Sequence, residues 1–70
     1  MKDLDLHGIK HSEVESIIEN HILLYEVPYK IIVGNSSFMK ETTIKILKKH
    51  NFEYIIWPYN LGSISILNKN

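Results

Sequence analysis

The chain of 70 residues has no cysteine, no long apolar segment and no excess of charge. Without cysteine it can form neither a disulfide nor a thiolate zinc site, so apolar burial must hold the fold together. No apolar run approaches the ~20 residues of a membrane span. Met1 leads directly into the charged residues Lys2 and Asp3, which predicts no signal peptide. We therefore expect residues 1–70 to form one small cytoplasmic domain with no membrane partner. Its length is near the lower limit at which a hydrophobic core is stable without disulfides or a metal ion.

The charges that sum to zero are unevenly distributed. Residues 2–26 contain six acids and two lysines, whereas residues 30–49 contain five lysines and one acid. A basic second half can meet a polyanion locally even when the whole chain is neutral. A solvated helix face explains the same pattern equally well.

Apolar periodicity predicts six elements in the order βαβαββ. The expected strands are residues 3–6, 29–33, 53–57 and 63–67; one helix follows Gly8 and ends before Pro28, and the other runs from Ser36 or Ser37 to His50. Residues 29–33 form a dense apolar run, which is typical of a parallel strand covered by helices. The expected fold is therefore α/β, a two-layer α+β sandwich with a four-stranded mixed sheet, two right-handed crossovers and a closing hairpin.

Local signals refine the ends and faces of these elements. Ser12 and Glu15 resemble a capping box, with Lys10 or His11 as the alternative cap. Asn51 suits a left-handed position after the second helix, and residues 68–70 are expected to fray. The apolar stripe of the first helix is expected to contain Val14, Ile17, Ile18, His21, Ile22 and Tyr25, and that of the second Met39, Thr43, Ile46 and Leu47.

The most informative motif is Leu4-Asp5-Leu6-His7-Gly8. Alternation along a strand places Asp5 and His7 on the same side, and Gly8 permits a sharp turn where the strand ends. Strand ends that lead into helices are where α/β domains usually keep their chemistry. An acid beside an imidazole at this edge predicts a site; the alternative is a pair that ties down the strand end by hydrogen bonds.

Residues Gly34, Asn35, Ser36 and Ser37 are the second half of the predicted site. A strand that passes through glycine to serines at a helix start exposes backbone N–H groups, which suit a phosphate. Ordinary helix capping, worth about 1 kcal/mol, explains the same residues without a ligand.

The side chains of Lys10 and Lys40 follow the two strand-end loops and can neutralise phosphates, although a single lysine is usually just solvated. His7 and His11 are four residues apart, but Gly8 separates a strand end from a helix start, so we predict no metal site. No cofactor is predicted. The aromatic residues are expected in or around the core, with Tyr59 the most free to stack on a base.

These motifs resemble the Smr (small MutS-related) domain family. Leu4-Asp5-Leu6-His7-Gly8 looks like the signature that opens such domains, and Ile31-Ile32-Val33-Gly34-Asn35-Ser36 lies where the family has a strand ending in His-Gly-x-Gly. Asn60-Leu61-Gly62-Ser63-Ile64 resembles the turn before its last strand. The resemblance covers nearly the whole chain, and the element order is also similar to that of the C-terminal domain of bacterial translation initiation factor three.

The resemblance implies nucleic-acid binding, to DNA or RNA, and in several branches endonuclease activity. It implies His7 as acid or base, Asp5 as its orienting partner, and Gly8, Asn60 and residues 34–37 as phosphate contacts. Val33 stands where the family motif has histidine, and Ser36 where it has the second glycine. Two alternatives therefore stay open, a non-catalytic module that binds nucleic acid or protein, and a binder of a small phosphorylated molecule.

Overall fold

The computed structural model describes residues 2–70, which form two helices and four strands. In chain order the elements are β1 (Leu4–Asp5), α1 (His11–Leu24), β2 (Tyr29–Ile32), α2 (Ser37–Lys49), β3 (Phe52–Ile55) and β4 (Ser63–Lys69). The predicted βαβαββ order is confirmed, and so is the two-layer α+β arrangement with a mixed sheet.

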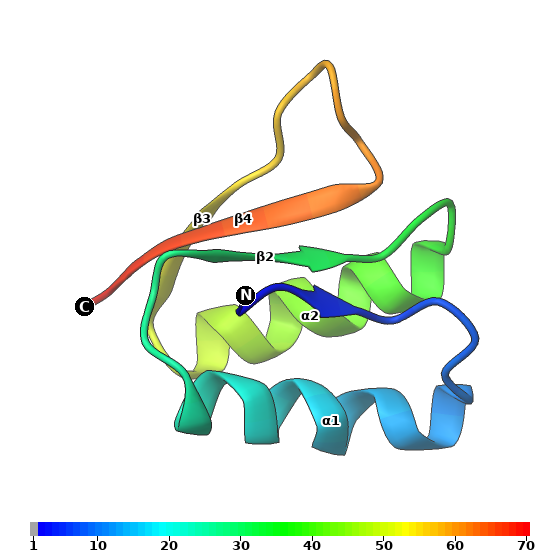
Figure 1. Ribbon diagram of the computed structural model, residues 1–70, viewed down its shortest axis with the longest axis horizontal. Coiled ribbons are helices and arrows are strands. Elements are labelled where there is room, and N and C mark those ends of the chain that lie inside the picture. Colours follow the sequence, from blue (N-terminus) through cyan, green and yellow to red (C-terminus); the bar gives the residue numbers. More distant parts are fainter. Residues whose placement is uncertain (1) are drawn as a thin grey trace.

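The sheet has the strand order β1-β2-β4-β3. β1 pairs with β2 in parallel, and β4 is antiparallel to both β2 and β3. β1, β2 and β3 therefore point the same way, and both helical connections advance across the sheet in one direction. Crossovers of the same hand that advance in one direction place their helices on one face. Figure 1 shows α1 and α2 together below the sheet, while the opposite face carries no helix of residues 2–70.

The core lies between the sheet and the two helices. Alternate strand residues point toward the helices, so Leu6, Ile31, Ile64 and Ile66 are fully buried. The helices contribute Val14, Ile18 and Ile22 from α1 and Met39, Thr43, Ile46 and Leu47 from α2. The predicted apolar faces are confirmed, with Tyr25 as the exception, because α1 ends at Leu24 and Tyr25 is 47% exposed.

Three predicted details of the elements are wrong. α1 begins at His11, so the predicted capping box is wrong and Ser12 lies inside the helix; the N-cap is Lys10, the predicted alternative, which makes no side-chain capping bond. β3 covers Phe52–Ile55, and residues 56 and 57 leave the sheet. The last residues do not fray: β4 continues to Lys69, which pairs with Phe52, and the Asn70 N–H donates to the Asn51 carbonyl at 2.8 Å.

An aromatic cluster, buried at His21 and Tyr29 and exposed at Tyr25, joins α1 to β2. The His21 ring packs edge-on against Tyr29 at 4.8 Å and tilted against Tyr25 at 4.6 Å, and its Nε2 is bonded to the Lys2 carbonyl oxygen. His21, which is predicted on the apolar stripe, is therefore a core residue. The Tyr29 hydroxyl is buried without a hydrogen-bond partner among residues 2–70, and burial raises the pKa of its phenol.

Replacing Tyr29 with Phe removes the unpaired hydroxyl and keeps the ring. We expect the free energy of unfolding at pH 7 to stay the same or rise by about 1 kcal/mol. Because the folded chain holds the phenol proton more tightly, the unfolded chain ionises first, and the native protein loses stability as pH rises from about 10. In urea titrations over this pH range, the free energy of unfolding should fall less in Tyr29→Phe than in the wild type. The control is Tyr59→Phe, because the Tyr59 ring is exposed. Identical pH profiles for both variants would contradict this account.

Candidate functional site

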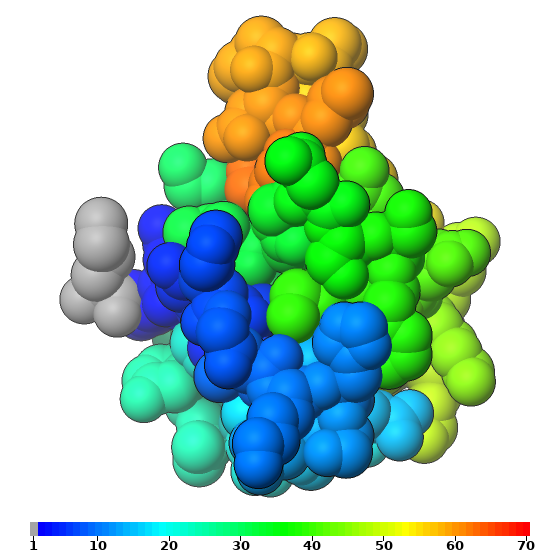
Figure 2. Space-filling model, turned by 90° about the vertical axis from the view of Figure 1, so that its right-hand side faces the viewer, coloured from blue at the N-terminus to red at the C-terminus, as the bar shows by residue number. Residues whose placement is uncertain are grey.

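Three connecting segments meet at one end of the molecule. β1, β2 and β3 are parallel to one another, so the segments that follow them, residues 6–10, 33–36 and 56–62, leave the sheet at the same edge. In Figure 2, which faces this end, the three segments lie one above another, in blue, green and orange. The predicted proximity of the first two strand ends is confirmed.

A shallow cavity of about 200 Å³ lies between the first two of these segments. His7, Gly8, Gly34, Asn35 and Ser36 line it, so the structure brings together five of the residues that the sequence placed in the site. The remaining wall is apolar and consists of Val33 and Met39, which sequence reasoning did not assign to the site.

Two glycines shape this cavity because both have left-handed backbone conformations. Gly8 has φ +79° and Gly34 has φ +61°, a region that strains residues with a Cβ. The turn at Gly8 is closed by the Ile9 N–H, which donates to the Leu6 carbonyl at 3.1 Å. The Val33 and Gly34 N–H groups both donate to the Gly62 carbonyl, at 2.8 and 2.9 Å. Gly62 thus fastens the third connecting segment to the end of β2.

Both helices begin beside this cavity. The Ser36 hydroxyl accepts a hydrogen bond from the Met39 N–H at 3.1 Å, which confirms Ser36 as the N-cap of α2. The first turn of α2 contains no acidic residue, so its partial positive charge is not offset locally. His11 at the start of α1 stacks on Phe38 in the first turn of α2, with ring centroids 4.2 Å apart. The two N-termini are therefore neighbours.

The side chain of Asp5 holds the turn rather than the imidazole. Its Oδ1 accepts a hydrogen bond from the backbone N–H of His7 at 2.9 Å, and both residues are exposed. This contact is the strand-end tie that the sequence left open as the alternative to a catalytic pair. Asp5 nevertheless fixes the backbone of His7, which lines the cavity.

The other predicted contact residues lie around the cavity without lining it. Lys10 caps α1, while Ser37 and Lys40 are in the first turn of α2. Asn60 lines a different cavity, on the open sheet face, although its Oδ1 would lie only 3.8 Å from a Cβ added to Gly62. Within residues 2–70 no three His, Asp or Glu side chains are grouped closely enough to hold a metal ion.

No family model matches the chain, and comparisons with curated proteins and with solved structures return no match. The likeness to Smr domains thus remains a prediction from the motif residues and the element order. Neither helix in residues 2–70 has the length and apolar character needed to cross a bilayer.

The two variants Asp5→Ala and Asp5→Asn test the strand-end tie. Alanine removes the acceptor of the His7 N–H, and we expect it to lower the free energy of unfolding by about 1 kcal/mol. Asparagine keeps an acceptor oxygen at this position and should cost less. Urea denaturation followed by the fluorescence of Trp57 measures both values. Wild-type stability in the alanine variant would show that the contact has no structural weight.

Proposed function

We propose that this chain is an Smr-like domain that binds nucleic acid, with a backbone phosphate in the cavity between residues 6–10 and 33–36. The observation that supports it is the convergence of His7 and the Gly34–Ser36 turn at the uncompensated N-terminus of α2. Backbone N–H groups at a helix start, with a dipole that favours negative charge, are a common phosphate site.

Nearby positive charge fits a polyanion better than an isolated phosphate. Lys10 is the N-cap of α1 and Lys40 lies in the first turn of α2, so both belong to the segments next to the cavity. By contrast, Lys49 lies near the far end of α2, where its Nζ is 3.8 Å from a Glu19 carboxylate oxygen. Part of the basic second half is therefore matched by the acidic first half, and the lysines near the cavity are the ones that fit a nucleic-acid backbone.

The size of the cavity favours a phosphate group that belongs to a larger ligand. At about 200 Å³ it is smaller than the roughly 300–1,000 Å³ typical of pockets that enclose a small molecule. A phosphate of a nucleic acid needs no such enclosure, because contacts continue along the backbone on either side. This observation ranks a small phosphorylated ligand below a nucleic acid.

Binding is better supported than cleavage. Among residues 2–70, His7 is the one titratable side chain that lines the cavity. Cleavage of a phosphodiester by acid–base chemistry normally uses two groups, one to remove a proton and one to donate one. Val33, where the family motif has histidine, is 3% exposed and supplies neither. We therefore propose a non-catalytic nucleic-acid-binding domain, with hydrolysis by His7 and Asp5 as the second candidate.

Salt-dependent binding tests the proposed phosphate contacts. Labelled RNA and DNA oligonucleotides are titrated with the protein at several salt concentrations, and binding is measured by fluorescence anisotropy. For a single strand, each lysine–phosphate contact changes the slope of log K against log salt by about 0.7. We expect the double variant Lys10→Ala/Lys40→Ala to flatten this slope by up to roughly 1.4, since two contacts are lost.

The matched control is Lys45→Ala/Lys48→Ala, which removes the same charge from exposed positions further along α2. Equal losses in both double variants would place the binding elsewhere, and absence of salt-dependent binding would refute the proposal. The same reactions, run on a gel with and without Mg²⁺ beside His7→Ala, detect cleavage. If the wild type cleaves the strand and His7→Ala does not, the nuclease becomes the preferred function in place of the non-catalytic binding domain.

A further inference from the structure

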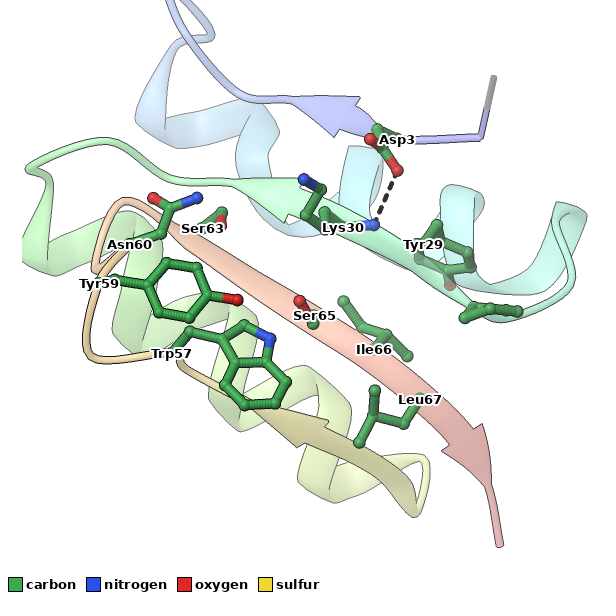
Figure 3. Close-up of a pocket in the computed structure, with 11 residues that line it drawn as sticks. Asp3, Tyr29, Lys30, Trp57, Tyr59, Asn60, Ser63, Ser65, Ile66 and Leu67 are labelled. Atoms are coloured by element: carbon green, nitrogen blue, oxygen red, sulfur yellow. Dashed lines mark hydrogen bonds between the residues drawn. The ribbon is translucent and has the colours of Figure 1, made fainter.

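A second cavity lies on the face of the sheet that the helices leave uncovered. It has a volume of about 380 Å³, and Figure 3 shows it over β4, between β2 and the segment that follows β3. Ser65 forms part of its floor, Trp57 and Tyr59 flank it on one side, and Lys30 on the other. The phosphate site described above does not include these residues.

The flank formed by Trp57 and Tyr59 is an exposed aromatic surface. The two rings stack with their centroids 5.8 Å apart and their planes at 21°. Trp57 is 39% exposed and Tyr59 is 82% exposed. Every nucleobase presents a flat π face that stacks on such rings, so exposed aromatic side chains are the usual platforms for unpaired bases.

The rest of the lining is mixed, as suits a base with apolar faces and polar edges: Pro28, Ile66 and Leu67 are apolar, and several polar groups lie among them. Lys30 and Asn60 contribute donors, the Ser65 hydroxyl can donate and accept, and Asp3 contributes a carboxylate. One Asp3 oxygen already accepts the Lys30 backbone N–H at 2.9 Å. An apolar side chain placed here would leave these groups unpaired, whereas the edge of a base can hydrogen-bond with them.

The two cavities are neighbours through the segment between β3 and β4. Asn60, which lines the open-face cavity, precedes Gly62, whose carbonyl binds the backbone of Val33 and Gly34 in the wall of the phosphate cavity. The charges of the two sites also differ. The open-face cavity has one charge of each sign, from Asp3 and Lys30, whereas the α2 N-terminus carries a partial positive charge that favours a phosphate.

We propose that the open-face cavity binds an unstacked nucleobase of a single strand whose backbone lies at the neighbouring phosphate site. This inference rests on the proposed nucleic-acid binding and specifies its substrate as single-stranded. In a duplex the bases are stacked and paired inside the helix, so they cannot lie against Trp57 and Tyr59.

The experiment uses Trp57, the one tryptophan of the chain, as its reporter. Three probes of equal length are titrated: a single-stranded oligonucleotide, the same strand in a duplex, and an abasic strand. We expect the single strand to quench Trp57 fluorescence and to bind roughly tenfold more tightly than the other two, because stacking contributes only with an unpaired base.

Substitutions at Tyr59 separate stacking from general loss of the surface. Tyr59→Ala should weaken single-strand binding by roughly tenfold and leave abasic-strand binding unchanged, while Tyr59→Phe keeps the ring and should bind as the wild type does. Leu61→Ala is the matched control, because Leu61 is an exposed apolar residue of the same segment. Binding is measured by anisotropy, so it does not depend on Trp57.

Failure of this inference is distinguishable from failure of the proposed function. Equal binding of the single and abasic strands, with no change in Trp57 fluorescence, would overturn base stacking and leave the phosphate site standing. Tighter binding of the duplex would also overturn it. Absence of salt-dependent binding to all three probes would refute both proposals.

Discussion

The common direction of β1, β2 and β3 is the constraint from which the other features follow. Because the three strands are parallel, both helical connections advance across the sheet in one direction and cover one face. The same direction brings the segments after the three strands to one edge, where both helices also begin. It leaves the opposite face to side chains from the strands and from residues 56–62. The meeting of the three segments at one end of the sheet and the uncovered face are thus two consequences of one topology.

Burial of apolar side chains, rather than ion pairing, holds the two layers together. The Glu19 carboxylate contacts His50 at 3.1 Å and Lys49 at 3.8 Å, which links α1 to the end of α2. All three side chains retain solvent contact, and such pairs contribute about 0–1 kcal/mol. A single fully buried Ile or Leu contributes roughly 1.5–3 kcal/mol, and this core has several. The charge asymmetry of the sequence therefore contributes little to the stability of the fold, and it matters chiefly for the proposed nucleic-acid binding.

Local sequence signals predict the helices and the N-cap of α2, which depend on neighbouring residues. They do not predict the strand ends or the open-face cavity, which depend on contacts between residues far apart in the chain. Periodicity located both helices and their buried faces, and Ser36, one of the two serines predicted as caps, is the N-cap of α2. The end of β4 was wrong because a register shift between Glu53 and Tyr54 lets β4 continue along β3 to Lys69. No local pattern announces such a bulge. The open-face cavity is not predicted from the sequence either, because its lining residues come from separate strands. Only Tyr59 is singled out by the sequence, as an exposed aromatic residue.

The position of Val33 connects stability to the proposal of binding without cleavage. Val33 is buried at the end of β2, where it belongs to the hydrophobic core and also lines the cavity proposed to hold a phosphate. An imidazole here would leave water for an apolar wall, which disfavours its charged form. A valine instead adds to the core and supports the turn whose N–H groups at residues 33 and 34 bind the Gly62 carbonyl. The Val33 side chain thus stabilises the strand end. Among residues 2–70, His7 is the only histidine that lines this cavity. In the proposed binding domain, this arrangement supplies a firm turn at a helix N-terminus without the second proton-transfer group that cleavage requires.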